Sequence, residues 1–168
     1  GISITPLQLV TAICAAVNGG TLYTPYIVDK IQNSYTNEIV YETKPNAVRQ
    51  VISEDTSAKV RDALEGVVTD GGGKNAYIDG YRIGGKTGTA QKAVDGSYVD
   101  GGYILSFVGV APIDNPQIVL YIAMDNPKNT IQYGGTTVAP IAKKMFQDIL
   151  PTMEIEKVSE QRQKAYVY

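Results

Sequence analysis

Residues 80–91 read GYRIGGKTGTAQ, and this stretch fits two motifs that require different folds. Read from Gly80, it has the pattern GxxxxGKT of a phosphate-binding P-loop, in which the lysine and threonine open a helix. Read from Lys86, it is KTGTA, a glycine-rich segment whose alternating side chains suit a β-strand. The residues on either side of the stretch decide between the two interpretations.

The P-loop interpretation has one further coincidence in its favour. Residues 118–125, IVLYIAMD, form an apolar run that ends in aspartate, as the magnesium-binding strand of such an enzyme would. However, a P-loop needs a buried strand before its glycines and a helix at its lysine. Asp79 and Gly80 interrupt the segment before the motif, and Gly88 stands where the helix should rise. No helical crossover is predicted between the last two strands, so the sequence disfavours a nucleotide hydrolase.

The strand interpretation fits both flanks. Alternation from Tyr81 places Lys86 and Gly88 on one face of the strand, and Thr87 and Thr89 on the other. Glycine removes side-chain bulk where another chain must approach the backbone. A strand with free backbone N–H groups, an ammonium and two hydroxyls is suited to hold an extended peptide that ends in a carboxylate. A glycine-rich edge strand without a function is the alternative, because short motifs match by chance.

Composition narrows the chemistry that these residues could perform. The chain has 168 residues, a formal net charge of −2 and 43% hydrophobic residues, which is typical of one globular domain and gives no reason to expect a nucleic-acid partner. It has no histidine, which excludes Ser-His-Asp and Cys-His catalysis and nearly every zinc site. Its single cysteine, Cys14, cannot form an intrachain disulfide, and its apolar surroundings predict a core position. We expect no metal and no cofactor, and proton transfer by lysine, carboxylate or tyrosine.

The first 50 residues predict a helix followed by a β-hairpin. Thr5 suits an N-cap, Pro6 the first helical position, and Gly19-Gly20 the end of the helix. Residues 24–31 and 38–42 are short runs rich in β-branched residues around a polar segment, which predicts the hairpin. Helical spacing predicts that one stripe of the helix is buried: Leu7, Val10, Cys14 and Val17.

The rest of the chain predicts two more helices and an antiparallel sheet. A helix starts near Ser53 and ends at the glycines 71–73, with Val60, Leu64, Val67 and Val68 as its apolar stripe. Residues 103–112 and 117–125 predict two antiparallel strands joined by a turn. A third helix is predicted from about Thr137 to Leu150, with Pro151 as its end and the following apolar face: Val138, Ile141, Met145, Phe146 and Ile149. This order of elements indicates an α+β fold.

Longer stretches of the chain resemble one enzyme family. Residues 1–28, GISITPLQLVTAICAAVNGGTLYTPYIV, are similar to a helix-and-hairpin segment of class B penicillin-binding proteins, the monofunctional peptidoglycan D,D-transpeptidases. RIGGKTGTAQK (82–92) and YILSFVGVAP (103–112) resemble the third motif of this family and the strand after it. The resemblance runs in order from Gly1 to about Leu150 and includes the YGG sequence at residues 133–135.

The resemblance implies a fold and a reaction. The fold would be that of the penicillin-binding-protein and serine β-lactamase family, an antiparallel sheet flanked by helices. The reaction would be serine acyl transfer, in which the enzyme is acylated by a peptidoglycan stem peptide ending in D-Ala-D-Ala, releases the last D-Ala and passes the acyl group to an amine. β-Lactams would bind as mimics of that dipeptide, and the enzyme would work on the extracytoplasmic face of a bacterial cell membrane through an anchor outside this chain.

The same resemblance assigns roles to four residues. Lys86 would supply positive charge beside a relay serine and the substrate. Thr87 and Thr89 would bind the substrate carboxylate, and Gly88 would let the substrate backbone pass close. The backbone N–H of Thr89 would form half of an oxyanion hole, a contribution typically worth about 3 kcal/mol of the barrier. The N–H of the nucleophilic serine would form the other half.

Two motifs of the family are missing from the chain. No serine has a lysine three residues later, and none begins SxN. Thr56-Ser57-Ala58-Lys59 and Tyr35-Thr36-Asn37 match related patterns by letters, but they fall at a helix start and in a hairpin loop. We therefore expect residues 1–151 to be the C-terminal part of a transpeptidase domain and 152–168 a polar tail or linker. An upstream half with the SxxK and SxN motifs would be the partner, and the isolated chain would be inactive.

Four other functions remain as alternatives. A β-lactamase or a penicillin-sensor domain shares the fold but would turn over or merely report the drug. A carboxypeptidase would release D-Ala without an acceptor amine. A non-catalytic peptide-binding module would bind the stem peptide and never become acylated.

Overall fold

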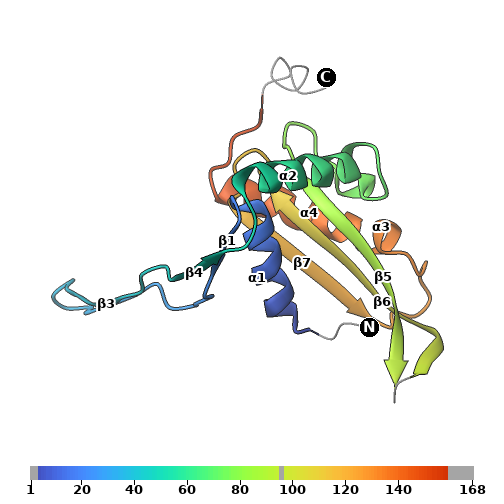
Figure 1. Ribbon diagram of the computed structural model, residues 1–168, viewed down its shortest axis with the longest axis horizontal. Helices are drawn as coiled ribbons and strands as arrows, with labels where there is room; N and C mark the ends of the chain where they lie inside the picture. The colour runs from blue at the N-terminus through green and yellow to red at the C-terminus, as the bar shows by residue number, and fades with distance from the viewer. Residues whose placement is uncertain (1–3, 95–96, 159–168) are drawn as a thin grey trace. The chain divides into compact units, whose positions relative to one another are not determined.

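The computed structural model describes residues 4–94 and 97–158, and the chain divides into two compact units, 1–58 and 59–168. The first unit contains α1 (Pro6–Val17), β1 (Thr21–Tyr23), β2 (Lys30–Gln32), β3 (Ile39–Glu42), β4 (Ala47–Gln50) and the start of α2 (Glu54–Thr69). The second contains the rest of α2, the 3₁₀ turn η1 (Lys74–Ala76), β5 (Gly84–Val94), β6 (Ser97–Ala111), β7 (Ile118–Asp125), α3 (Gly134–Thr137) and α4 (Ala139–Thr152) (Figure 1).

Helix α1 begins and ends where the sequence predicts. The Gln8 N–H donates to Thr5 Oγ1, and the Thr5 N–H donates to Gln8 Oε1, so the two residues form a capping box. After the helix, Gly19 and Gly20 have φ values of +94° and +99°, a region that glycine enters without strain. Gly20 also approaches the Ile52 carbonyl so closely that a Cβ would lie 2.0 Å from its oxygen. The glycine pair is therefore a steric requirement of this turn.

The predicted buried stripe of α1 is correct only toward the C-terminal end of the helix. Val17 is buried, whereas Leu7 is 61% exposed. The reason is the length of β1, which packs along α1. Three strand residues span roughly 10 Å, while twelve helical residues span about 18 Å, so β1 cannot cover the first turns. Cys14 lies at intermediate depth, and burial raises the pKa of its thiol.

The predicted hairpin is present, and a second strand pair adjoins it. β2 and β3 pair antiparallel, with Ile31 opposite Tyr41, and their side chains are exposed. The strand predicted over residues 24–31 is shorter than expected, since β2 starts at Lys30. β1 pairs with β4, a pairing that the sequence did not predict because each strand has only three or four residues.

A buried serine joins the start of α2 to the end of α1 within the first unit. The Ser57 side chain is fully buried. Its hydroxyl donates to the Ala16 carbonyl at 2.8 Å and accepts the Gly19 N–H at 3.0 Å. These bonds satisfy two backbone groups at the C-terminal end of α1, where helical partners are lacking.

The second unit is built on the antiparallel sheet β5-β6-β7. Between β5 and β6, Lys86 is opposite Val108 and Thr89 is opposite Leu105. Between β6 and β7, which are also antiparallel, Val108 is opposite Tyr121. Lys86 and Thr87 thus lie inside a strand and not at the start of a helix, which excludes the P-loop interpretation. The two predicted strands 103–112 and 117–125 are confirmed as neighbours.

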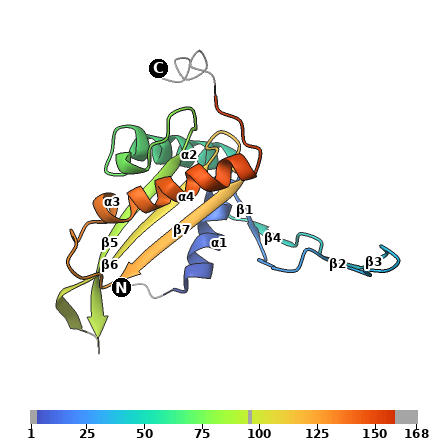
Figure 2. The ribbon, with the colours of Figure 1, turned by 180° about the vertical axis from the view of Figure 1, so that it is seen from behind.

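Helix α4 covers one face of this sheet, as the view from behind shows (Figure 2). Its Phe146 ring occupies the space beside Gly109, where a Cβ would lie 2.4 Å from a ring carbon. The predicted apolar face is confirmed at Val138 and Phe146, which are buried, but not at Ile141 and Met145, which are each 38% exposed. The small residues Ala139 and Ala142 are buried as well, since the helix approaches the sheet closely there; the buried positions are Val138, Ala139, Ala142, Phe146 and Leu150.

The second half of α2 is anchored to the segment that leads into β5. The Arg82 guanidinium contacts Glu65 of α2 through two nitrogens, with Nε 2.7 Å from Oε1. The Arg82 and Glu65 side chains are 11% and 21% exposed, so this fork is only partly solvated. The Ile113 N–H also donates to the Arg82 carbonyl. The entry to β5 is therefore fixed from both α2 and the β6–β7 turn.

The C-terminal helix does not end at Pro151 as predicted. α4 continues to Thr152, and Pro151 lies within its last turn, where its missing N–H removes a single hydrogen bond. The described part of the predicted tail packs on the unit: the Val158 N–H donates to the Gly80 carbonyl at 2.7 Å, and Ile155 contacts the core. Residues 159–168 of that tail lie outside the described residues.

Two glycine substitutions test this packing. We expect Gly109→Ala to destabilise the chain by about 1–3 kcal/mol, because the new Cβ would overlap the Phe146 ring. Gly66→Ala is the matched control, since Gly66 is exposed in the last turn of α2 and nothing lies within 4 Å of its Cβ. It should stabilise by roughly 0.5–1 kcal/mol. Urea unfolding followed by circular dichroism measures both, and equal effects would contradict the packing described here.

Candidate functional site

The four predicted site residues lie together in the first half of β5. Lys86 and Thr89 are exposed, and Thr87 and Gly88 lie at intermediate depth. The contacts below agree with the predicted alternation, with the two threonines on the face toward α3. The site is thus one strand with two chemically different faces: hydroxyls on one, and an ammonium beside a glycine on the other.

On the threonine face, the YGG sequence contacts both hydroxyl-bearing residues. The Gly134 N–H donates to Thr89 Oγ1 at 3.2 Å. A Cβ at Gly135 would lie 3.3 Å from the Thr87 methyl group. Among the described residues, no hydrogen bond to the Thr87 hydroxyl is recorded. The Thr89 hydroxyl is therefore held by a backbone donor, whereas the Thr87 hydroxyl is available to a ligand.

Close backbone packing fixes the YGG sequence against the strand. A Cβ at Gly134 would lie 2.4 Å from the Gly88 carbonyl oxygen and 2.7 Å from that of Ser106. A Cβ at Gly135 would lie 2.1 Å from the Gly72 carbonyl oxygen, and the Asn75 side chain donates to the Gly135 carbonyl at 2.8 Å. Three segments therefore meet here without room for side chains: β5, the glycine loop after α2, and the start of α3.

On the opposite face, the Lys86 side chain folds back to the backbone of β5 at its exposed edge. Its Nζ donates to the Thr87 carbonyl at 2.7 Å. Successive residues of an antiparallel strand direct their backbone groups alternately toward the partner strand and away from it. The exposed bond to Lys86 indicates that Thr87 directs its carbonyl to the edge away from β6. By the same alternation, the N–H of Thr89 faces this edge too.

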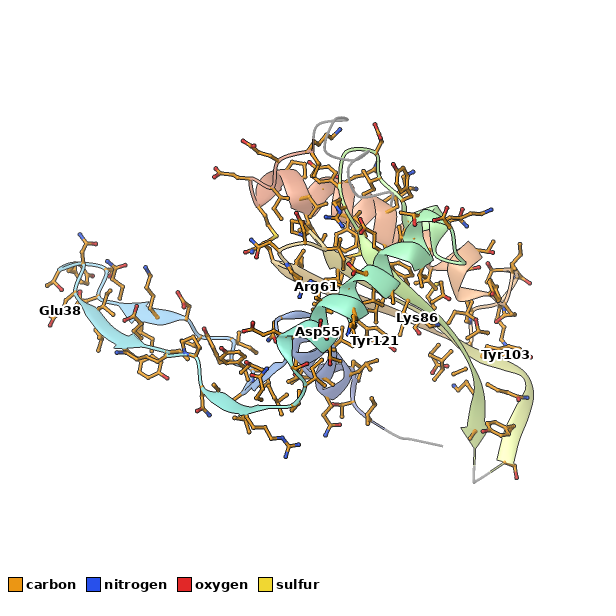
Figure 3. All side chains as sticks on the ribbon, turned by 45° about the horizontal axis from the view of Figure 1, so that its top comes forward. Glu38, Asp55, Arg61, Lys86, Tyr103 and Tyr121 are labelled. Carbon is orange, nitrogen blue, oxygen red and sulfur yellow. The ribbon has the colours of Figure 1, made fainter. Side chains whose placement is uncertain are left out.

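A serine of the neighbouring strand occupies the space that Gly88 leaves open. Ser106 is opposite Gly88 in the register, and a Cβ at Gly88 would lie 2.3 Å from Ser106 Oγ but 3.7 Å from its Cβ. The same face carries Tyr121 of β7, which Figure 3 labels together with Lys86. Ser106 was not among the predicted site residues, although alternation along residues 103–112 places it on this face.

The charge of Lys86 is not neutralised within the described ranges. Ion pairs in the described part of the second unit join Arg82 to Glu65 and to Asp114, and Lys92 to Asp125, and Lys86 takes part in none of these. An exposed ammonium beside a strand edge attracts anions and can stabilise negative charge that develops on a bound ligand. The arrangement can therefore bind an extended peptide through backbone groups and a carboxylate through hydroxyls and charge.

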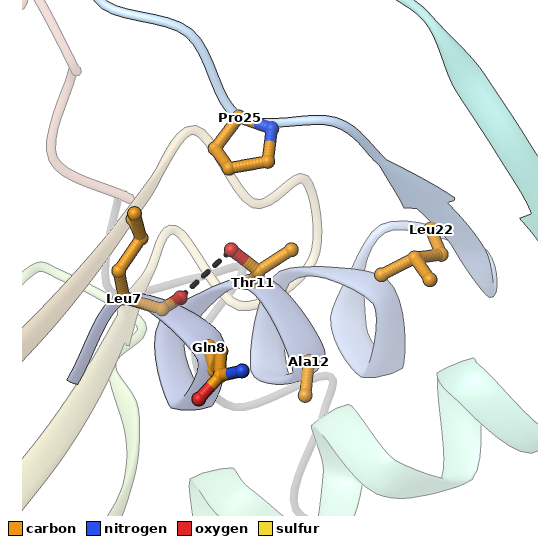
Figure 4. A pocket seen from close by; sticks show the side chains of 6 residues that line it. All are labelled: Leu7, Gln8, Thr11, Ala12, Leu22 and Pro25. Carbon is orange, nitrogen blue, oxygen red and sulfur yellow. Dashed lines mark hydrogen bonds between the residues drawn. The ribbon is translucent and has the colours of Figure 1, made fainter. Parts of the chain in front are cut away.

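The two partial matches to the missing motifs, at Thr56 and at Tyr35, lie outside this strand. Thr56 is in the first turn of α2, where its N–H donates to Ser53 Oγ. Tyr35 and Asn37 belong to the turn between β2 and β3. The first unit also has an open hollow of about 290 Å³ beside α1, which contains none of the predicted site residues (Figure 4). It is lined by Leu7, Gln8, Thr11, Ala12, Leu22 and Pro25.

Comparison with known sequences gives one family. A family model described as the penicillin-binding protein transpeptidase domain matches residues 1–147. The chain is 52% identical to stage V sporulation protein D of Bacillus subtilis over 166 residues, covering 99% of this chain and 26% of that protein. It is 33% identical to a probable peptidoglycan D,D-transpeptidase PenA of Neisseria meningitidis, covering 87% of this chain and 23% of that protein. The chain thus spans about a quarter of the length of these relatives.

Solved structures agree with these sequence matches. Penicillin-binding protein 3 of Mycobacterium tuberculosis in complex with ampicillin matches 95% of this chain and 37% of that chain, with a TM-score of 0.82 at 30% identity. The transpeptidase domain of penicillin-binding protein 3 from Burkholderia pseudomallei matches 95% of this chain and 45% of that chain, with a TM-score of 0.77 at 33% identity. In residues 4–94 and 97–158 of this chain, no helix is long and apolar enough to cross a membrane.

A pair of isosteric substitutions tests the hydrogen bonding of the threonine face. Thr89→Val should destabilise the chain by about 1–3 kcal/mol, because it leaves the buried Gly134 N–H without an acceptor. Thr87→Val should change stability by less than about 0.5 kcal/mol, since it removes no recorded bond. Urea unfolding measures both variants. A larger loss for Thr87→Val than for Thr89→Val would contradict this assignment.

Proposed function

Because the chain belongs to the penicillin-binding protein transpeptidase-domain family, we propose that β5 forms the substrate-binding wall of a serine D,D-transpeptidase that cross-links peptidoglycan. The observation that carries the proposal is the strand itself: an open edge with an ammonium on one face and two hydroxyls on the other. A stem peptide ending in D-Ala-D-Ala would add to this edge as an extended strand.

Thr87 and Thr89 bind the terminal carboxylate in this proposal. Residues two apart on a strand project from the same face, so their hydroxyls can donate to the two oxygens of one carboxylate. Hydrogen bonds to an ionised acceptor are roughly twice as strong as neutral ones. Lys86 adds a positive charge from the opposite face, and Gly88 between the threonines keeps the path of the peptide backbone open.

The N–H of Thr89 stabilises the oxyanion. The alternation of backbone groups from the Thr87 carbonyl supports an edge-facing Thr89 N–H. A donor fixed in a strand needs no reorganisation when negative charge develops on the substrate carbonyl oxygen, and one such donor typically contributes about 3 kcal/mol. Lys86, three residues away, would assist a proton relay near the same carbonyl.

The nucleophile comes from the SxxK motif of an upstream segment, because no serine of this chain has that pattern. The serine oxygen attacks the carbonyl of the penultimate D-Ala, and the peptide nitrogen leaves with a proton as free D-Ala. An amine of a second stem peptide then attacks the acyl-serine, which restores the hydroxyl and forms the cross-link. Residues 1–151 contribute the third motif to this site, and the isolated chain is inactive.

The names of the relatives support a cellular setting. The 52% identical relative is called a sporulation protein, which favours a role in spore formation over division. The structures of penicillin-binding protein 3 with ampicillin and with aztreonam support β-lactams as ligands. Cross-linking of peptidoglycan takes place outside the cytoplasm, so the proposed location is the extracytoplasmic face of the cell membrane, with an anchor outside residues 1–168.

The first test is the intact mass of the protein after incubation with ampicillin. This chain alone should show no adduct, and a mixture with the upstream half should show one adduct, on the upstream chain. An adduct on this chain alone would contradict the assignment of the nucleophile. Two associating halves without any adduct would leave β5 as a peptide-binding strand only. Rapid hydrolysis of the drug would indicate a β-lactamase.

A second test separates the role of Gly88 in binding from its role in folding. Gly88→Ala should destabilise the chain, because its Cβ would overlap Ser106 Oγ. Ser106→Ala in the same chain removes that overlap, since the Ser106 Cβ lies at an ordinary 3.7 Å. The double variant should regain stability and still be acylated at least tenfold more slowly, because the added methyl narrows the peptide path. Full recovery of acylation would refute the role of Gly88.

A further inference from the structure

The segment between β7 and α3 is held by side-chain contacts of its own. It contains two left-handed residues, Asn126 with a φ of +49° and Asn129 with a φ of +56°, a conformation that asparagine tolerates better than most residues. The Thr137 hydroxyl donates to the Ile131 carbonyl at 2.6 Å. The segment ends at Gly134, the residue that donates to Thr89. Its conformation therefore bears directly on the threonine face of β5.

Gln132 makes the central contacts of this segment. Its Nε2 donates to the Pro127 carbonyl at 2.7 Å and to the Thr130 carbonyl at 3.2 Å. Because both partners are acceptors, only the nitrogen side of the amide can face them. The Oε1 atom is buried and has no hydrogen-bond donor among the described residues. A buried acceptor without a donor is costly, so the two Nε2 bonds hold this amide in an orientation that is unfavourable for its oxygen.

The contact at Gly134 determines how the Thr89 hydroxyl can act. A hydroxyl can accept hydrogen bonds at its oxygen and donate one through its hydrogen. The Gly134 N–H occupies an acceptor position of Thr89 Oγ1. The hydroxyl hydrogen remains available and is repelled from the Gly134 N–H, so it points away from α3. A carboxylate requires this donating orientation, because ionised oxygens accept hydrogen bonds only.

We propose that Gln132 is a positioning residue for carboxylate recognition: its amide holds residues 127–134, so that the Gly134 N–H orients the Thr89 hydroxyl as a donor. The inference rests on the proposed function only in taking the ligand of Thr89 to be a carboxylate. Gln132 does not touch the substrate. It acts indirectly: its amide binds the Pro127 and Thr130 carbonyls, and the segment held in this way carries the Gly134 N–H that contacts Thr89.

The volume of Gln132 offers a competing explanation, because any side chain of its size could fill the same space. Gln132→Glu separates the two explanations, since glutamate has nearly the same shape but would direct a carboxylate at two carbonyls. Gln147→Ala is the control for loss of a glutamine amide, because Gln147 is exposed on α4. If volume is what matters, Gln132→Glu behaves like the unchanged protein.

A double-mutant cycle in the full-length protein tests the proposal, with the second-order rate constant of acylation by ampicillin as the readout. Thr89→Val should slow acylation roughly tenfold, and Gln132→Glu should slow it by a similar or smaller factor. Combined with Thr89→Val, Gln132→Glu should slow acylation no further, because both changes remove the same donor. Gln147→Ala should have no effect.

Each outcome has a separate meaning. Unchanged acylation in Thr89→Val would refute the proposed binding of the carboxylate by the Thr89 hydroxyl. Slower acylation in Thr89→Val, with independent and multiplicative effects of the two substitutions, would overturn the role of Gln132 alone. Hydrogen exchange at the Gly134 amide gives a readout without catalysis: Gln132→Glu should accelerate it severalfold, and an unchanged rate would also overturn the inference.

Discussion

The second unit depends on a close approach between aromatic rings and glycine backbone. Phe107 occupies the space beside Gly85 on β5, and Phe146 of α4 occupies the space beside Gly109 on β6; a Cβ at either glycine would lie 2.4 Å from a ring carbon. This contact seats α4 on one face of the sheet and fixes the register of β5 against β6. The alternation of β5 then follows, with hydroxyls toward α3 and the ammonium on the other face. The packing of Gly85 against Phe107 therefore determines which face of β5 carries the Lys86 ammonium and which carries the threonine hydroxyls.

Much of this arrangement could be predicted, because the signals are local. The capping box of Thr5 and Gln8, the start of α2 near Ser53 and the two strands around the β6–β7 turn all follow from residues close in sequence. The faces of Lys86 and Thr87 follow from alternation alone. The KTG strand and its family could be recognised because several such signals occur in the right order.

The errors arose where partners distant in sequence decide the outcome. The predicted apolar face of α4 included Ile141 and Met145, which are exposed, whereas close contact with the sheet buries Ala139 and Ala142 beside the correctly predicted Val138 and Phe146. The pairing of β1 with β4 joins strands too short to carry a pattern. The proposed positioning role of Gln132 could not be predicted from the sequence, because it depends on hydrogen bonds to two backbone carbonyls and no sequence motif describes such a contact. Steric fit, and not residue type, decides these cases.

We propose that the edge of β5 receives a peptide-like ligand with its carboxylate at the two threonines. A crystal structure of the full-length protein acylated by ampicillin tests it most directly. We expect the drug carboxylate within hydrogen-bond distance of the Thr87 and Thr89 hydroxyls, and the acyl oxygen within that distance of the Thr89 N–H. An acyl group whose carboxylate lies away from both threonines, or whose oxygen has another donor, would contradict it.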